Sequence, residues 1–158
     1  MTAARVTLRR MGAADVEDFL AATAPAYAAE RAVADHVGEA EAAARARTQT
    51  DRLLSQRGDT PGHHFAAVVD TATGDRVGGV WFFLDAETRE GFVYYLTVSP
   101  PCRRRGFARA ALSEVEAAAR AAGCRTLGLN VFAPNAAAIA LYAGAGFAAV
   151  AQYMNKRL

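Results

Sequence analysis

The alternation of hydrophobic and polar residues along the chain, together with short apolar runs, predicts a set of β-strands. The stretches with this pattern are Arg5–Arg9, Phe65–Val69, Val77–Leu84 and Gly91–Val98. The last three follow one another with only short connections, and Gly74 supplies the turn in the first connection. These three strands are therefore expected to form an antiparallel meander.

Apolar residues at helical spacing predict two helices before this meander. The first is expected over Ala13–Glu30 and the second over His36–Leu54. Pro25 lies inside the first pattern, where its ring and missing N–H are expected to kink the helix or to end it near Ala24. The turn-rich residues Ser55–Gly62 then separate the helices from the strands.

The part of the chain after the meander is expected to alternate between helix and strand. A helix with an apolar stripe is predicted over Ala108–Ala122, and Gly123 ends it. The strand that follows, Thr126–Val131, should lie parallel to Gly91–Val98, because a helix connects the two in a right-handed crossover. If such a pair separates at one end, its unpaired backbone groups line a slot that fits a thin chain with amide bonds.

Asn135 is expected to cap a short helix that runs to about Ala143. Beyond it, Phe147–Val150 and Tyr153–Arg157 are expected to form a closing β-ribbon. The predicted fold class is therefore α+β, with a twisted, mostly antiparallel sheet, a central parallel strand pair and about four flanking helices. Residues 1–158 are expected to form a single domain, because this length suits one sizeable core.

Composition narrows the class of protein. With 53% hydrophobic and 22% charged residues the chain is typical of a globular protein, and a net charge of +2 argues against a dedicated nucleic-acid binder. No membrane span or secretory signal is recognisable, so a reducing cytoplasm is the expected location. The two cysteines, Cys102 and Cys124, show no metal spacing, and His36, His63 and His64 lack a third ligand, so no metal is expected.

One segment carries candidate binding chemistry, because arginines and a glycine lie between the last meander strand and the next helix. It reads Val98-Ser99-Pro100-Pro101-Cys102-Arg103-Arg104-Arg105-Gly106-Phe107-Ala108-Arg109. The first turn of a helix leaves backbone N–H groups without partners and carries the positive end of the helix dipole. Anionic oxygens bind well at such a place, so Arg103 to Arg109 is a candidate phosphate site.

Two motifs resemble those of the GNAT superfamily of N-acetyltransferases. The first, V-x-P-x-x-R-x-x-G-x-A, runs from Val98 to Ala108 and resembles the family's acetyl-coenzyme A motif. The second, N-x-x-A-x-x-L-Y-x-x-x-G-F, runs from Asn135 to Phe147. Both occur in the family's order and separation, and the resemblance extends from Phe65 to the C-terminus.

The resemblance implies an enzyme that transfers the acetyl group of acetyl-CoA directly to a primary amine of a small molecule or peptide. It implies that Tyr142 protonates the departing thiolate as a general acid and that the backbone N–H of Val98 polarises the thioester carbonyl. Gly106 and Ala108 would keep the turn small enough for N–H groups to reach the pyrophosphate. The residues implied to contact acetyl-CoA are Leu96, Thr97, Val98, Arg103, Arg104, Arg105, Gly106, Phe107, Ala108, Arg109, Asn135 and Tyr142.

The resemblance leaves the general base open. Many relatives carry an acidic residue on the strand that leads into the first motif, whereas this strand reads Phe92-Val93-Tyr94-Tyr95-Leu96-Thr97. Glu90 and Glu30, each acting through water, and the hydroxyl of Tyr95 are the candidates that remain.

Two functions of other classes stay open on the sequence alone. A non-catalytic domain that binds CoA and regulates a partner fits the missing base. A nucleic-acid binder fits the basic segment Arg103–Arg109. The acceptor amine is not determined by the sequence, and the resemblance leaves a homodimer open.

Overall fold

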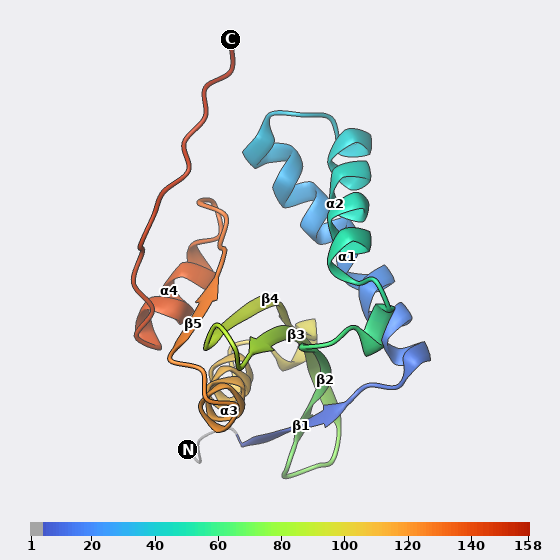
Figure 1. Cartoon of the computed structure of the whole chain (residues 1–158), viewed down its shortest axis with the longest axis vertical. Helices are drawn as coiled ribbons and strands as arrows, with labels where there is room; N and C mark the ends of the chain where they lie inside the picture. The colour runs from blue at the N-terminus through green and yellow to red at the C-terminus, as the bar shows by residue number, and fades with distance from the viewer. Residues whose placement is uncertain (1–4) are drawn as a thin grey trace. The chain divides into compact units, whose positions relative to one another are not determined.

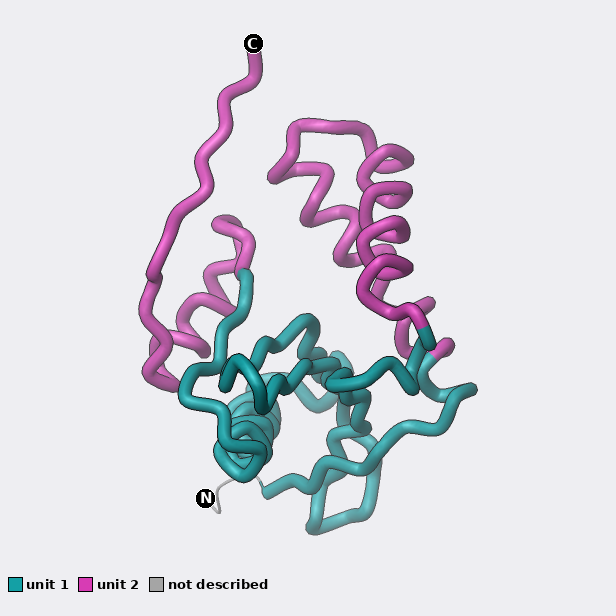
Figure 2. Tube along the Cα trace, in the orientation of Figure 1, with its two compact units in different colours: residues 1–16, 56–130 teal, residues 17–55, 131–158 magenta. Residues whose placement is uncertain are grey.

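The computed structural model describes residues 5–158, which form two compact units (Figures 1 and 2). Unit 1 holds residues 5–16 and Gln56–Asn130, and unit 2 holds Glu17–Ser55 and Val131–Leu158. The elements, in chain order, are β1 (Val6–Arg10), α1 (Ala13–Asp35), α2 (Glu39–Leu53), β2 (His63–Asp70), β3 (Arg76–Asp85), β4 (Glu90–Val98), α3 (Phe107–Ala121), β5 (Thr126–Leu129) and α4 (Ala136–Gly144). Short 3₁₀ helices lie at Arg57–Asp59 and Pro100–Cys102.

Unit 1 is built on one five-stranded sheet with the strand order β1-β2-β3-β4-β5. The first four strands are antiparallel neighbours, and β5 pairs with β4 in parallel. The chain passes from β4 to β5 through α3, the kind of crossover that a parallel pair requires. The predicted α+β class, with a mostly antiparallel sheet and one parallel pair, is confirmed.

The predicted closing β-ribbon is wrong. Residues 147–157 form no strand, so the parallel pair lies at the β5 edge of the sheet and not at its centre. Small alanines interrupt the few large apolar residues of this segment, and alanine is depleted in strands. Val150 and Tyr153 are 98% and 86% exposed, so little apolar surface is buried to offset the entropy of ordering the segment.

The hydrophobic core of unit 1 lies between α3 and one face of the sheet. α3 contacts β1, β2, β3 and β4. The largest fully buried side chains are Leu112 and Val115 on α3 and Val68 and Val80 on the sheet. This packing holds α3 against the sheet. It therefore also fixes in space where α3 begins, a few residues after β4 ends.

Helix α1 continues through Pro25, so of the two predicted effects, a kink or an end near Ala24, the end is wrong. A proline removes one intrahelical hydrogen bond, but the alanines on both sides of it are strong helix formers. α1 ends at Asp35, and His36 adopts a left-handed φ of 55°. His36 therefore closes α1, and α2 begins only at Glu39.

Among residues 5–158, no helix has the length and the apolar character that crossing a membrane would take.

We predict that Gly78→Ala destabilises the protein by about 2–3 kcal/mol. A Cβ at Gly78 would overlap the carbonyl oxygen of Thr97, a backbone atom of β4 that cannot move without disturbing the β3–β4 ladder. Urea unfolding followed by the fluorescence of Trp81, the single tryptophan, measures the loss.

Gly128→Ala in β5 is the matched control, since its Cβ would lie 3.5 Å from the Phe92 ring, an ordinary van der Waals distance. This control is expected to stay within about 1 kcal/mol of the wild type. Equal stabilities of the two variants would contradict the close approach of β3 and β4.

Candidate active site

Strand β5 pairs with only the first half of β4. The parallel ladder covers Glu90–Val93, whereas β4 runs on to Val98. At the end of the ladder β4 carries a β-bulge, in which Tyr94 has no counterpart on β3. Bulges bend a strand, end its pairing and recur beside active sites. Among residues 5–158, the second half of β4 therefore pairs with β3 and with no strand on its other side.

The direction of the backbone groups decides what this edge of β4 offers to a ligand. The N–H of Ser99 donates to the carbonyl of Val77 at 2.8 Å, so Ser99 faces β3. Because backbone groups alternate in direction along a strand, the N–H groups of Leu96 and Val98 point away from β3. Thr97, between them, directs its N–H toward β3, so a contact of Thr97 with acetyl-CoA would come from its side chain.

The turn between β4 and α3 has the backbone geometry of an anion site. Arg104 and Gly106 have positive φ angles of 60° and 86°. Gly106 is the N-cap of α3 and has no side chain to bond the first N–H groups. The N–H of Ala110 donates to the carbonyl of Gly106 at 3.0 Å, so the N–H groups between these two residues precede the helical ladder. Such N–H groups, with the helix dipole behind them, bind phosphate oxygens.

Arginine side chains surround the beginning of α3, and Arg103, Arg104 and Arg105 are exposed. Nε of Arg103 donates to the carbonyl of Val98 at 3.0 Å, which uses one of its five N–H donors. The guanidinium of Arg105 lies over the Phe107 ring, 5.0 Å from its centroid. The Phe107 ring is 4% exposed and belongs to the core, so this residue can offer a ligand little beyond its backbone. The turn thus combines N–H groups that precede the helical ladder with positive charge, which fits the pyrophosphate of acetyl-CoA.

Comparison with known proteins decides the family. The model of the acetyltransferase (GNAT) family matches residues 26–147. The chain belongs to this family. Members are acetyltransferases that use acetyl-CoA as co-substrate.

Two relatives of this GNAT chain come from Bacillus subtilis (strain 168). The uncharacterized N-acetyltransferase YycN is 31% identical over 155 residues, which cover 97% of this chain and 99% of YycN. The uncharacterized N-acetyltransferase YdgE is 27% identical, over 96% of this chain and 98% of YdgE. The crystal structure of YycN matches the fold with a TM-score of 0.89, at 30% identity over 97% of this chain and 98% of that one.

The other predicted site residues of the acetyltransferase lie in unit 2, on α4. Oδ1 of Asn135 accepts the N–H of Ala138 at 3.1 Å, which confirms the predicted helix cap. Nδ2 of the same side chain donates to Oε1 of Glu30 on α1 at 3.2 Å. The spacing of residues along the chain gave no sign of this second bond. The predicted site residues therefore form two sets, one in each unit.

Tyr142 lies seven residues after Asn135, two helical turns along α4. Its ring packs edge-on against Phe147, with 5.8 Å between the ring centroids. Burial raises the pKa of the Tyr142 hydroxyl above its ordinary value of 10.0, and the negative charge of Glu30 raises it further. The phenol therefore stays protonated at neutral pH, the state that a general acid needs.

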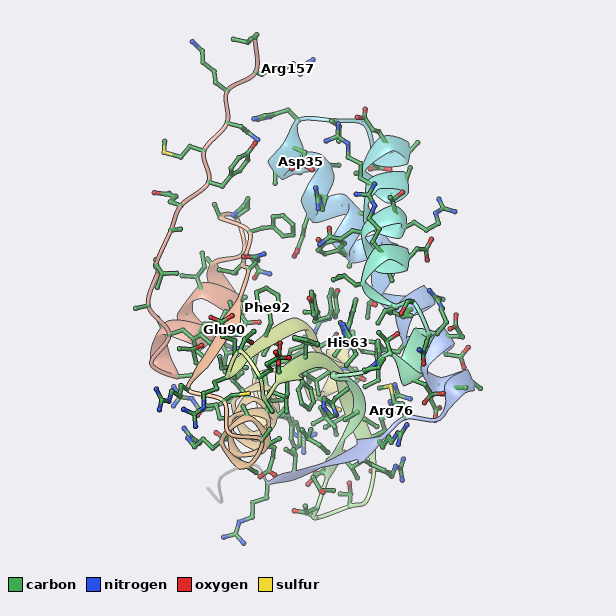
Figure 3. All side chains as sticks on the ribbon, in the orientation of Figure 1. Asp35, His63, Arg76, Glu90, Phe92 and Arg157 are labelled. Carbon is green, nitrogen blue, oxygen red and sulfur yellow. The ribbon has the colours of Figure 1, made fainter. Side chains whose placement is uncertain are left out.

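Of the candidates for a general base, Glu90 has the least suitable place. Glu90, labelled in Figure 3, is exposed and is the first residue of β4, whereas Val98 is the last. Glu90 lies four positions before the bulge at Tyr94, roughly 13 Å along a strand. The half of β4 that lacks a β5 partner begins only beyond that distance.

The structure also assembles an aromatic cluster on β2, β3 and β4. It lies on the sheet face that points away from α3, because Trp81 follows the buried Val80 along β3. The rings that stack or tilt against one another here, around the labelled His63 and Phe92 of Figure 3, are those of His63, Phe65, Trp81, Phe83, Phe92 and Tyr94.

A hydrogen bond at the centre of this cluster determines the protonation of a histidine. Nε1 of Trp81 donates to Nδ1 of His63 at 3.0 Å, so neutral His63 carries its proton on Nε2. Burial lowers the pKa of His63, and the charge of His64 lowers it further. Within residues 5–158, no three side chains of His, Cys, Asp or Glu gather as they would at a metal site.

We predict that mild acidification destabilises the acetyltransferase through His63. Because its pKa is lowered in the folded state, the unfolded chain binds the proton more readily, and the free energy of unfolding falls as pH drops below the ordinary value of 6.5. Urea unfolding at about pH 7.5 and about pH 5.5 measures the fall.

His63→Phe keeps a ring in the cluster but cannot titrate, so its stability should depend less on pH than that of the wild type. At about pH 7.5 the variant is expected to lose about 1 kcal/mol, because Trp81 loses its acceptor. His64, whose pKa burial also lowers, supplies the pH dependence that remains. An unchanged pH dependence in His63→Phe would contradict the prediction.

Proposed function

We propose that this chain transfers the acetyl group of acetyl-CoA directly to a primary amine of a small molecule or peptide. The observation that carries the proposal is the beginning of α3, where the uncapped N–H groups after Gly106 meet three exposed arginines. This is the chemistry that a pyrophosphate needs from a protein. The membership in the GNAT family supports acetyl-CoA as the molecule that carries it.

In this proposal the backbone of β4 holds the reactive arm of acetyl-CoA. The pantetheine chain is thin and carries two amide bonds, which suit the edge of β4 that lacks a strand partner. The N–H of Val98 polarises the thioester carbonyl, and the N–H of Leu96, which points the same way, is a second donor on this edge. Because the β3–β4 ladder fixes the backbone of β4, these two N–H groups need not reorient when negative charge develops on the carbonyl oxygen.

The proton chemistry is assigned to side chains of unit 2. Tyr142 donates its phenolic proton to the departing sulfur, and its raised pKa supports this role. Asn135 caps α4 and so fixes the helix that carries Tyr142. Much of the rate would come from orientation, since the enzyme holds a nitrogen against a carbonyl carbon.

The proposal also includes the location and the partners of the enzyme. We place the reaction in the cytoplasm, in line with two cysteines that form no disulfide. The partners proposed are acetyl-CoA and an amine acceptor, with no nucleic acid and no membrane, and a homodimer stays open.

We predict that acetyl-CoA binds to the wild type and binds at least about tenfold more weakly to Gly106→Ala, a loss of about 1.4 kcal/mol. An alanine at the N-cap opposes the left-handed φ of 86°, so the turn that presents these N–H groups is distorted. Titration calorimetry gives both affinities.

Gly123→Ala is the matched control, because Gly123 follows the other end of α3 with a φ of 84° and nothing within 4 Å of its added Cβ. It carries the same backbone strain away from the phosphate site and should bind acetyl-CoA like the wild type. Absence of acetyl-CoA binding to the wild type would refute the proposed function.

We predict that Tyr142→Phe lowers kcat by about 10²-fold and leaves the affinity for acetyl-CoA unchanged. The substitution removes the proton donor but keeps the ring that packs on Phe147. Release of free thiol across a panel of amines measures turnover. Tight binding of acetyl-CoA by the wild type, with no thiol released by any amine, would identify a CoA-binding regulatory domain instead.

A further inference from the structure

One face of α1 lies along the segment that carries α4, and all of these residues belong to unit 2. The Tyr27 ring packs against the Phe132 ring, with centroids 5.8 Å apart. One turn further, Glu30 accepts the hydrogen bond from Asn135. One more turn along, the carbonyl of Ala34 accepts a hydrogen bond from the Asn155 side chain at 2.8 Å. Residues 27, 30 and 34 share one helical face, so the position of Glu30 is fixed by contacts on both sides of it.

The contact with Asn135 connects Glu30 to the cap of α4. The two polar atoms of the Asn135 side chain have separate partners, since Oδ1 holds the N–H of Ala138 and Nδ2 holds the Glu30 carboxylate. The same side chain therefore starts α4 and orients a carboxylate toward it. The negative charge of that carboxylate helps to raise the pKa of the Tyr142 hydroxyl, two turns further along α4.

The nearby arginine has other partners, which leaves the Glu30 carboxylate available to accept a proton. The neighbouring arginine on α1, Arg31, is engaged elsewhere: it donates to Asp35 at 2.8 Å and to Gln49 at 2.8 Å. The charged and titratable groups that the contacts place along this part of α1 are Tyr27, Arg31 and Asp35 on α1 itself and Arg45 on α2, which pairs with Asp35, while Tyr142 on α4 responds to the Glu30 charge. Glu30 itself is exposed, so an amine from solvent can approach it.

We propose that Glu30 is the general base of acetyl transfer and that it forms a proton relay with Tyr142. The inference rests on the proposed function, because it needs Tyr142 to act as the general acid. It also names the acceptor more closely. A carboxylate at this place attracts an ammonium group, so the substrates are amines that are positively charged at neutral pH.

The relay balances every bond and proton of the reaction. The charged amine first loses one proton to the Glu30 carboxylate, which passes it to solvent water. The neutral nitrogen then forms the C–N bond and gives a second proton to Glu30, while the C–S bond breaks and the sulfur takes the phenolic proton of Tyr142. The protonated Glu30 returns its proton, through water, to the Tyr142 phenolate, which restores both side chains. The net result moves one proton from nitrogen to sulfur and releases one to water.

Glu30→Gln tests the relay, because the amide oxygen of glutamine still accepts the hydrogen bond from Asn135. The variant should bind acetyl-CoA normally and lose about 10²-fold or more in kcat/KM with strongly basic amines. The loss should be much smaller with weakly basic amines, which arrive uncharged and need no proton removed before attack. Asp18→Asn, an exposed carboxylate lost from the same helix, is the matched control and should behave like the wild type.

A second readout does not depend on knowing the substrate. The tyrosine absorbance of Glu30→Gln should titrate at a lower pH than in the wild type, because the charge that helps to raise the Tyr142 pKa is gone. Part of the upward shift should remain, since burial is its larger cause. The same comparison in a Tyr142→Phe background should show no difference and so assigns the signal to Tyr142.

The outcomes separate the two proposals. A wild type that binds no acetyl-CoA refutes the proposed function. An active wild type with a Glu30→Gln variant that is equally active, or that loses the same factor with every amine, refutes the relay alone. Overlapping tyrosine titrations of the two proteins also refute it. If Glu30→Gln does not fold, Glu30→Asp decides the question: a shortened base should lower kcat and keep the wild-type dependence on amine basicity.

Discussion

Strand β4 pairs with β3 and with β5 over unequal lengths, and this difference determines where the candidate site lies. β3 pairs with β4 along its whole length, whereas β5 leaves it at Val93, next to the bulge at Tyr94. The second half of β4 is thus held by β3 on one side, while no strand of the described residues pairs with its other side. A strand held in this way presents N–H groups in a fixed direction, which is what binding a developing oxyanion requires. The burial of Leu112 and Val115 then holds α3 where β4 ends, so that the phosphate turn follows directly.

The two sets of site residues use different kinds of chemistry. In unit 1 the proposed binding groups are mostly backbone N–H groups, and exposed arginines add positive charge around them. Arg103 braces the carbonyl of Val98, and Arg105 lies over a core ring. In unit 2 the groups are side chains that can hold or release a proton, namely Glu30 and Tyr142. This separation has a physical reason, since backbone amides bind anions well but cannot change protonation near neutral pH.

Periodicity predicted the parts of the fold that buried apolar residues determine. The strands β2–β4 and the helix α3 carry most of the buried apolar side chains of unit 1. Asn135 has a local role as a helix cap, which its residue type indicates. The predicted strands in residues 147–157 were wrong because the apolar residues of that segment are not buried. The predicted end of the helix near Ala24 was wrong because the helix propensity of the surrounding alanines outweighs the effect of Pro25. The bulge at Tyr94 depends on the register of two strands, which no single strand encodes. The bond between Glu30 and Asn135 joins residues 105 positions apart, and nothing in either local pattern indicates it.

Histidine is the usual proton acceptor near neutral pH, and His63 stacks on the bulge residue Tyr94. Its place in the aromatic cluster nonetheless argues against a role as base. The lone pair of Nδ1 is taken by the N–H of Trp81, and the other nitrogen carries the proton, so neutral His63 can donate but has no free position to accept. Accepting a proton would break the bond to Trp81 and charge a ring whose pKa burial already lowers. A carboxylate keeps several lone pairs after accepting one hydrogen bond, and this difference in capacity favours Glu30 over His63 as the acceptor of the proton from the amine.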